Sequence, residues 1–274
     1  MFFKDIIGQE KIKKRLIQSV QESRISHAQL FLGPEGSGSL PMALAFAQYL
    51  HCMNKQENDS CGNCPACKKM EKLVHPDVHF SFPIVKTAKS TEGVVRSKDP
   101  VSDNFIEDWR TQFLKNNYIN LNQWLNALGL ENKQASIYTH ESDEIIKKLS
   151  LKSFESEYKV LIMWMPEKMN DQAANKLLKL IEEPPAKTLF ILVAENQDQI
   201  IKTILSRTQI VAFQKIDDAS FFDALKSNYD LKDQQIWDII KLANGNYSKA
   251  KELIESTEEN DLFFEKFTLL MRMS

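Results

Sequence analysis

Apolar and polar positions follow two rhythms along most of this chain. Continuous apolar runs predict strands at 27–32, 160–165, 189–194 and 210–213, and those at 160–165 and 189–194 are typical of strands buried within a sheet. Helical spacing predicts helices between them, over 8–24, 41–50, 141–151, 170–183 and 200–205. Residues 75–80 add a further extended stretch. Strands that alternate with helices predict an α/β fold, with a parallel sheet and helices on both faces.

The strand pattern ends after residue 213. Helical spacing then recurs over 218–227, 232–243 and 246–256, and Asn244-Gly245 before the last of these is typical of a helix end. We therefore expect an α/β domain over 1–213, a small all-α domain over 214–257 and the start of another helical element over 258–274.

Residues 82–137 break the alternation and are interpreted as an insertion with one or two helices. We expect the aromatic side chains of this segment to form a local core, an interpretation we favour over base stacking: Trp109, Phe113, Tyr118 and Trp124. The sequence predicts no role for the insertion.

The segment Gly33-Pro-Glu-Gly-Ser-Gly-Ser-Leu40 stands between a predicted strand and a predicted helix, as a phosphate-binding P-loop does. A working P-loop continues with a lysine for the outer phosphates and a hydroxyl for Mg²⁺. Ser39 and Leu40 occupy these places. We favour a structural turn without hydrolysis. Weak anion binding stays open, because backbone N–H groups of a tight turn could still face an anion at Gly33, Gly36 and Gly38.

All four cysteines lie close together, in the order Cys52-x8-Cys61-x2-Cys64-x2-Cys67. Four thiolates at this spacing predict a closed, structural Zn²⁺ site in a module of about residues 51–70. Two disulfides are the alternative, and a reducing compartment disfavours them. A nucleic-acid-binding zinc module would need basic and aromatic residues between the cysteines, and Gly62-Asn63 and Pro65-Ala66 supply neither.

Composition narrows the class of protein. A formal net charge of −2 argues against a strongly basic nucleic-acid-binding module, and 43% hydrophobic residues allow a packed core. There is no apolar run long enough to span a membrane, and the first residues lack a signal-peptide pattern. We expect a cytoplasmic protein with no membrane partner.

Three strings together resemble one family, the AAA+ subunits of the bacterial clamp loader of DNA polymerase III. They are Phe3-Lys-Asp-Ile-Ile-Gly-Gln-Glu10, Asn175-Lys-Leu-Leu-Lys-Leu-Ile-Glu-Glu-Pro-Pro185 and Ile204-Leu-Ser-Arg-Thr208, the last with threonine where the family has cysteine. Members carry a zinc module at the position of the cysteine cluster. The resemblance covers about 1–81 and 138–256. It implies an AAA+, P-loop NTPase-like domain and a lid, followed by a collar domain of which 258–274 would be a truncated start.

The resemblance also implies nucleotide-site positions that this chain fills differently. The family's Asp-Glu pair falls on Trp164 and Met165, its polar sensor near Ala194-Glu195, and its lid arginine on Ser248. With Ser39 and Leu40, these departures imply a subunit that does not hydrolyse ATP. A gamma/tau-like ATPase motor is the alternative, and it would need a lysine at position 39 and acids at 164 and 165.

Arg207 matches a family arginine that reaches a neighbour's ATP, so the resemblance implies an arginine finger supplied in trans. The alternative is an ordinary loop arginine. The implied function belongs to DNA replication. The implied partners are the ATP-hydrolysing gamma/tau subunits, the delta subunit and, through the complex, the sliding clamp and primed DNA.

Overall fold

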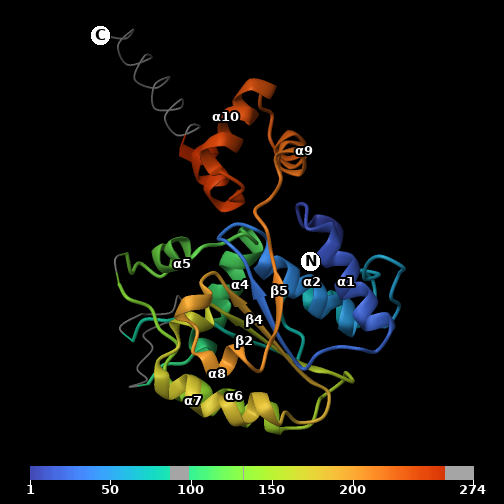
Figure 1. Ribbon diagram of the computed structural model, residues 1–274, viewed down its shortest axis with the longest axis vertical. Coiled ribbons are helices and arrows are strands. Elements are labelled where there is room, and N and C mark those ends of the chain that lie inside the picture. Colours follow the sequence, from blue (N-terminus) through green and yellow to red (C-terminus); the bar gives the residue numbers. More distant parts are fainter. Residues whose placement is uncertain (87–98, 132, 257–274) are drawn as a thin grey trace.

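The computed structural model describes residues 1–86, 99–131 and 133–256 (Figure 1). Within these residues, five parallel strands form one sheet in the order β2-β3-β4-β1-β5. The strands are β1 Ala28–Leu32, β2 Val78–Ser81, β3 Lys159–Trp164, β4 Thr188–Ala194 and β5 Gln209–Ala212. The predicted parallel α/β sheet is confirmed.

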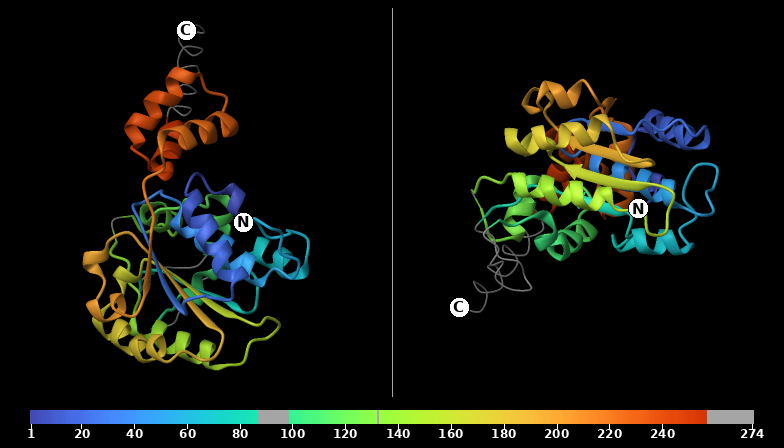
Figure 2. Two further views of the ribbon diagram at one scale, coloured as in Figure 1. Left: turned by 45° about the vertical axis from the view of Figure 1, so that its right-hand side comes forward. Right: turned by 90° about the horizontal axis from the view of Figure 1, so that it is seen from below.

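Helices cover both faces of the sheet (Figure 2). One face packs against α1 Glu10–Gln21, α2 Ser39–His51, α4 Ile106–Lys115 and α5 Leu121–Ala127. The other packs against α6 Thr139–Ser150, α7 Asp171–Glu182 and α8 Lys202–Leu205. Along β3, Ile162 points into the first core and Leu161 into the second. Burial on both faces explains the continuous apolar runs in the sequence.

Shorter elements complete the α/β part. Helix α3 spans Pro65–Glu71, and single 3₁₀ turns lie at Phe3–Asp5, Ser102–Phe105, Pro166–Lys168 and Gln197–Gln199. None of the helices in the described ranges is long and apolar enough to cross a membrane.

A small helical lid follows β5 and stands beyond one end of the sheet (Figures 1 and 2). It contains α9 Asp218–Asn228, α10 Asp233–Ala243 and the helical residues 247–256. Its separate core includes Phe221, Ile236 and Tyr247. Asn244 adopts a left-handed conformation (φ 51°) and ends α10, as the Asn-Gly pair predicted.

The aromatic side chains of the insertion form the expected cluster only in part. Trp109 contacts Phe113 and Trp124, with ring centroids 6.1 and 5.4 Å apart, but this cluster belongs to the main core and does not include Tyr118. Trp109 stacks on Phe82 with ring centroids 4.6 Å apart and lies 5.0 Å from Trp164 of β3. Phe113 and Trp124 join the same main core. Tyr118 instead packs into the core of the lid. Two short helices bury too little area by themselves, so their aromatic side chains complete larger cores nearby.

Helix α1 carries a cluster of four basic residues, Lys11, Lys13, Lys14 and Arg15. Such a cluster predicts a solvated helix face rather than a DNA site, and the structure departs from that prediction at one position. Lys13 is buried, and its Nζ donates to the carbonyl oxygen of Ile6 at 2.7 Å and to Glu10 at 2.7 Å. Lys11, Lys14 and Arg15 are exposed, as expected for a solvated helix face.

Candidate functional site

The glycine-rich loop connects the carboxyl end of β1 to α2, where a P-loop would lie. Gly36 and Gly38 have positive φ values of 72° and 92°, and Gly38 caps α2. A Cβ atom at Gly36 would stand 2.0 Å from Oδ1 of Asn246 in the lid. A Cβ atom at Gly33 would stand 2.4 Å from Cβ of Phe213. Here the glycines allow close approach of the protein's own side chains and backbone.

The cavity beside this loop is very small. It holds about 20 Å³, and its lining includes Glu35, Tyr118, Trp164 and Glu195. Ligand pockets usually hold roughly 300 Å³ or more. The space therefore admits water but not a nucleoside triphosphate without movement of the residues around it.

Carboxylates surround the loop where phosphate would require positive charge. Burial, followed by the charges of Glu35 and Glu167, raises the pKa of Glu195 to about 7. Burial also raises the pKa of Glu167, although its Oε1 accepts a hydrogen bond from the backbone N–H of Glu195 at 2.8 Å. Acidic side chains at these positions repel an anion. This arrangement favours the structural turn over the anion site left open by the sequence.

Glu195→Gln should change how stability depends on pH. Because folding raises the pKa of Glu195 from 4.5 to about 7, the folded state keeps a proton that the unfolded state loses over this range. The contribution of Glu195 to stability therefore falls as pH rises from about 4.5 to 7. We expect the variant to gain about 2 kcal/mol over the wild type above pH 7 and little near pH 4.5.

Urea unfolding of both proteins between about pH 5 and pH 8 measures this difference. Glu131→Gln, at an exposed position, is the control. The difference curve isolates Glu195, because buried histidines with lowered pKa values contribute equally to both proteins. A difference that stays flat across this range would contradict a raised pKa at Glu195.

The other positions that the resemblance assigned to a nucleotide site are occupied by core residues. Trp164 is buried against Trp109, and Met165 is 5% exposed in a left-handed conformation (φ 57°). Ser248 is fully buried, with its Oγ 3.4 Å from Oε1 of Gln123 in the insertion. None of the three offers a carboxylate to a metal or a positive charge to a phosphate.

Arg207 lies after α8 beside an open cavity of about 430 Å³, which is lined by His27, Ile181, Glu182, Ser206 and Arg207. Its side chain is 35% exposed. The guanidinium pairs with the carboxylate of Glu182, at the end of α7. Its NH1 group donates to the carbonyl oxygen of Thr203 at 2.9 Å and to Oγ of Ser206 at 3.0 Å. The arrangement holds a cation at an accessible surface, and Arg207 does not line the small cavity beside the glycine-rich loop.

The four cysteine Sγ atoms, of Cys52, Cys61, Cys64 and Cys67, all lie within 4.8 Å of one another, and the thiols are free rather than paired in disulfides. In a tetrahedral zinc site with Zn–S bonds of about 2.3 Å, sulfur atoms stand about 3.8 Å apart. The cluster is thus near the required geometry. Backbone N–H groups also point at sulfur, from Cys61 to Sγ of Cys52 at 3.3 Å and from Cys64 to Sγ of Cys61 at 3.4 Å. Such donors stabilise thiolates, so the donor set fits Zn²⁺.

The cysteine segment contacts the start of the chain. The carboxylate of Asp59 accepts hydrogen bonds from the backbone N–H groups of Phe3 at 3.2 Å and Lys4 at 3.1 Å. Ser60 accepts a hydrogen bond from Gln48 of α2 at 2.6 Å. Through these contacts the cysteine segment connects the N-terminus of the chain to α2. A metal ion that ordered this segment would therefore stabilise the fold around it.

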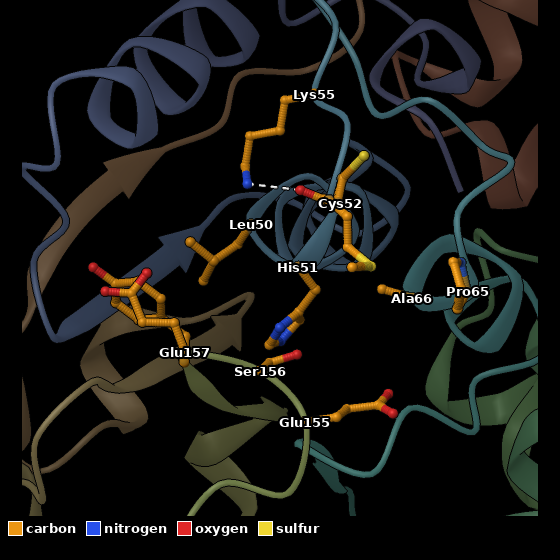
Figure 3. A pocket seen from close by; sticks show the side chains of 11 residues that line it. Leu50, His51, Cys52, Lys55, Pro65, Ala66, Glu155, Ser156 and Glu157 are labelled. Atoms are coloured by element: carbon orange, nitrogen blue, oxygen red, sulfur yellow. Dashed lines mark hydrogen bonds between the residues drawn. The ribbon is translucent and has the colours of Figure 1, made fainter.

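A separate cavity of about 430 Å³ lies between this segment and the loop before β3 (Figure 3). Its lining includes Cys52, Lys55 and Glu155. The buried ring of His51 points into it and stacks on His75, with ring centroids 4.4 Å apart. Burial, with the nearby imidazole of His75, lowers the pKa of His51 to about 3, so this ring stays neutral.

The family model for the DNA polymerase III delta subunit matches residues 8–217. The chain belongs to this family. It is 28% identical over 217 residues to subunit delta′ of Bacillus subtilis DNA polymerase III, covering 79% of this chain and 51% of that protein. It is 26% identical over 259 residues to subunit gamma of Buchnera aphidicola, covering 93% of this chain and 58% of that protein.

The relatives of this chain thus include a delta′ subunit as well as gamma and tau subunits of DNA polymerase III. The sequence resemblance to clamp-loader subunits, which was nearest to delta′, is confirmed. The chain spans about half the length of the first two curated relatives, 51% and 58%.

Solved structures support the AAA+ fold of this family member. A DNA polymerase III gamma subunit-related protein of Thermotoga maritima matches with a TM-score of 0.50 and 16% identity, covering 88% of this chain and 56% of that one. A RuvB variant of the same organism also matches with a TM-score of 0.50, at 12% identity, covering 93% of this chain and 63% of that one. At such identities the likeness shows the fold alone.

The sequence did not reveal the side chains that connect the glycine-rich loop to the insertion and to the lid. Tyr118 and Asn120 come from the insertion, whereas Asn246 and Glu252 come from the lid. Asn120 and Gln123 have the spacing of a capping box and do begin α5 as one. That signal predicts the start of a helix but not its partners more than eighty positions away along the chain.

Proposed function

We propose that this chain is a clamp-loader subunit of DNA polymerase III that does not hydrolyse ATP and that supplies Arg207 to a neighbouring ATPase subunit. The single observation that supports this most is the contrast between two places. The P-loop cavity is about 20 Å³ and faces carboxylates, whereas Arg207 presents a guanidinium at an open surface.

The chemistry of Arg207 fits such a role. A guanidinium is always charged and can bind two phosphate oxygens at once, so it stabilises the charge that develops on a transferring phosphoryl group. Because Arg207 belongs to a different subunit from the one that holds the ATP, its guanidinium completes the ATP site only when the loader is assembled. Glu182 holds the guanidinium beside the end of α7 until it meets phosphate.

The proposed partners are the ATP-hydrolysing gamma/tau subunits, the delta subunit and, through the complex, the sliding clamp and primed DNA. The curated relatives are themselves delta′, gamma and tau subunits of DNA polymerase III. In the proposed division, residues 1–213 form the AAA+ domain and 214–257 the lid. The predicted start of a collar at 258–274 lies outside the described residues.

Zn²⁺ is the proposed cofactor, held by all four cysteines of the cluster. With four protein ligands the ion has no open position, so it supplies structure rather than catalysis.

A gamma/tau-like ATPase is the second candidate, favoured by matches that cover more than nine-tenths of this chain. It requires room for ATP and ligands for Mg²⁺. The residues at the end of β3, Trp164 and Met165, supply no such ligand.

Reconstitution of the loader tests the proposal. We expect gamma/tau and delta subunits to load the clamp onto primed DNA efficiently only when this chain, in its full length, is present. Loading that is equally fast without the chain would contradict a role as a loader subunit.

A further inference from the structure

Residues 116–123 of the insertion, here called the bridging segment, lie between the glycine-rich loop and the lid. The segment enters helix α5, which begins at Leu121. Its side chains contact the loop on one side and the lid residues 247–252 on the other. The insertion therefore touches both the glycine-rich loop and the lid.

Asn120 makes the central connection. Its Nδ2 group donates to Oε1 of Glu35 in the loop at 3.3 Å and to Oε1 of Glu252 in the lid at 3.0 Å. The residue is only 5% exposed. One amide group thus links a carboxylate of the loop to a carboxylate of the lid, and hydrogen bonds to charged acceptors are stronger than neutral ones.

Gln123 strengthens the lid side of this connection. Its Nε2 group donates to the same Oε1 atom of Glu252 at 2.9 Å, and its Oε1 atom lies 3.4 Å from Oγ of Ser248. Asn116 accepts a hydrogen bond from Nζ of Lys251 at 2.9 Å. Side chains of the bridging segment therefore bind Ser248, Lys251 and Glu252, which lie on one face of one lid helix.

Tyr118 covers the start of α2. Its hydroxyl oxygen lies 3.2 Å from the Cβ position of Gly38 and accepts a hydrogen bond from the backbone N–H of Ile7 at 3.0 Å. Its ring packs against Tyr247 of the lid, with centroids 4.8 Å apart. An aromatic ring thus stands where a P-loop's helix N-terminus would face phosphate.

We infer that the bridging segment is an internal ligand of the nucleotide-site frame. It fills the space beside the loop with amide and phenol groups and fixes the lid to the sheet domain in the absence of nucleotide. The loop carboxylate of Glu35 then becomes an attachment point for the lid rather than a defect in a phosphate site. This role deepens the proposed inability to use ATP and does not depend on Arg207.

Hydrogen–deuterium exchange on the full chain tests the inference. Asn120→Ser keeps an N-cap oxygen for α5 but loses the amide that joins Glu35 to Glu252. Asn120→Asp also keeps the cap and places a third carboxylate between the other two. We expect amides of residues 247–256 to exchange about tenfold faster in Asn120→Ser and faster still in Asn120→Asp. Exchange in β3 and β4 should stay unchanged.

Asn122→Ser is the matched control, because Asn122 is exposed on the same helix. Mg-ATP should leave lid exchange in the wild type unaltered. The inference fails if Asn120→Ser exchanges like the control, if protection is lost equally throughout the sheet, or if Mg-ATP protects the wild-type lid further. The first two outcomes leave the arginine proposal intact, because that proposal is read out by ATP turnover in the assembled loader.

Discussion

Arg207→Ala should lower ATP hydrolysis at the neighbouring subunit of the assembled loader by about 10³-fold, which is the lower end of the effect of an arginine finger. The loss should appear in the rate of the chemical step. ATP binding by the neighbour should change little, because its own P-loop makes most contacts with the nucleotide. The variant should fold normally, since the Arg207 side chain is 35% exposed and its ion pair with Glu182 is a surface pair.

Single-turnover hydrolysis in reconstituted loader measures this effect. Arg207→Lys keeps the charge but loses the planar fork, so we expect an intermediate rate. Arg24→Ala is the control, because Arg24 is an exposed arginine paired with Glu22 in the same protein. Equal hydrolysis rates for Arg207→Ala and Arg24→Ala would contradict a role of Arg207 as an arginine finger.

Cys64→Ser should release zinc and lower the midpoint of thermal unfolding by about 10 °C. Structural zinc contributes its binding free energy to folding, and a loss of roughly 3 kcal/mol has this effect in a domain of such size. The thiol is suited to bind metal. Although its burial opposes ionisation, N–H groups of Cys67 and Met53 and the neighbouring thiols lower the pKa of Cys64 to about 6.

Elemental analysis and thermal unfolding of the same preparations check this prediction. We expect about one zinc ion per wild-type chain. A chelator should lower the wild-type midpoint to that of Cys64→Ser. Met53→Ser, at a side chain 77% exposed beside Cys52, is the control and should keep both metal and stability. Metal-free wild-type protein with an unchanged midpoint would show that the cysteines have another role.

Much of the sheet domain could be predicted from local signals. The apolar runs marked β1, β3 and β4, because these strands are covered on both faces and must be apolar throughout. The run at β5 marked a strand as well, although β5 lies at the edge of the sheet and only its Val211 is buried. Either Asn170 or Asp171 could cap the helix predicted from 170, and it is Asn170 whose side chain accepts the N–H of Ala173, at 2.8 Å. Two prolines after Glu183 ended that helix as expected.

The insertion could not be predicted in the same way. The aromatic side chains of the insertion have partners that are distant in the sequence. Trp109 packs on Trp164 of β3, and Tyr118 packs on Tyr247 of the lid. Spacing identifies an amphipathic element but not the surface that it covers. The burial of Lys13 could not be predicted for the same reason. Its neighbouring basic residues are exposed, and Lys13 is buried because its Nζ group donates to the carbonyl oxygen of Ile6.

The candidate site was predictable in its missing groups but not in what replaced them. The sequence shows directly that Ser39 stands in place of the lysine that binds phosphate, and that Trp164 and Met165 stand in place of the family's acidic pair. The acidic surroundings and the closing amides depend on side chains from four separate segments. No local pattern relates Glu35 to Asn120 or Glu195 to Glu167, since the two members of each pair come from segments that are distant in the sequence.

Equilibrium binding of radiolabelled ATP to the isolated full chain tests the central claim most directly. A subunit whose P-loop cavity is only about 20 Å³ should show no saturable binding with Mg-ATP, while a gamma or tau subunit in the same assay should bind. Stoichiometric, saturable binding to this chain, competed by unlabelled ATP, would contradict the claim and identify it as a nucleotide-using subunit.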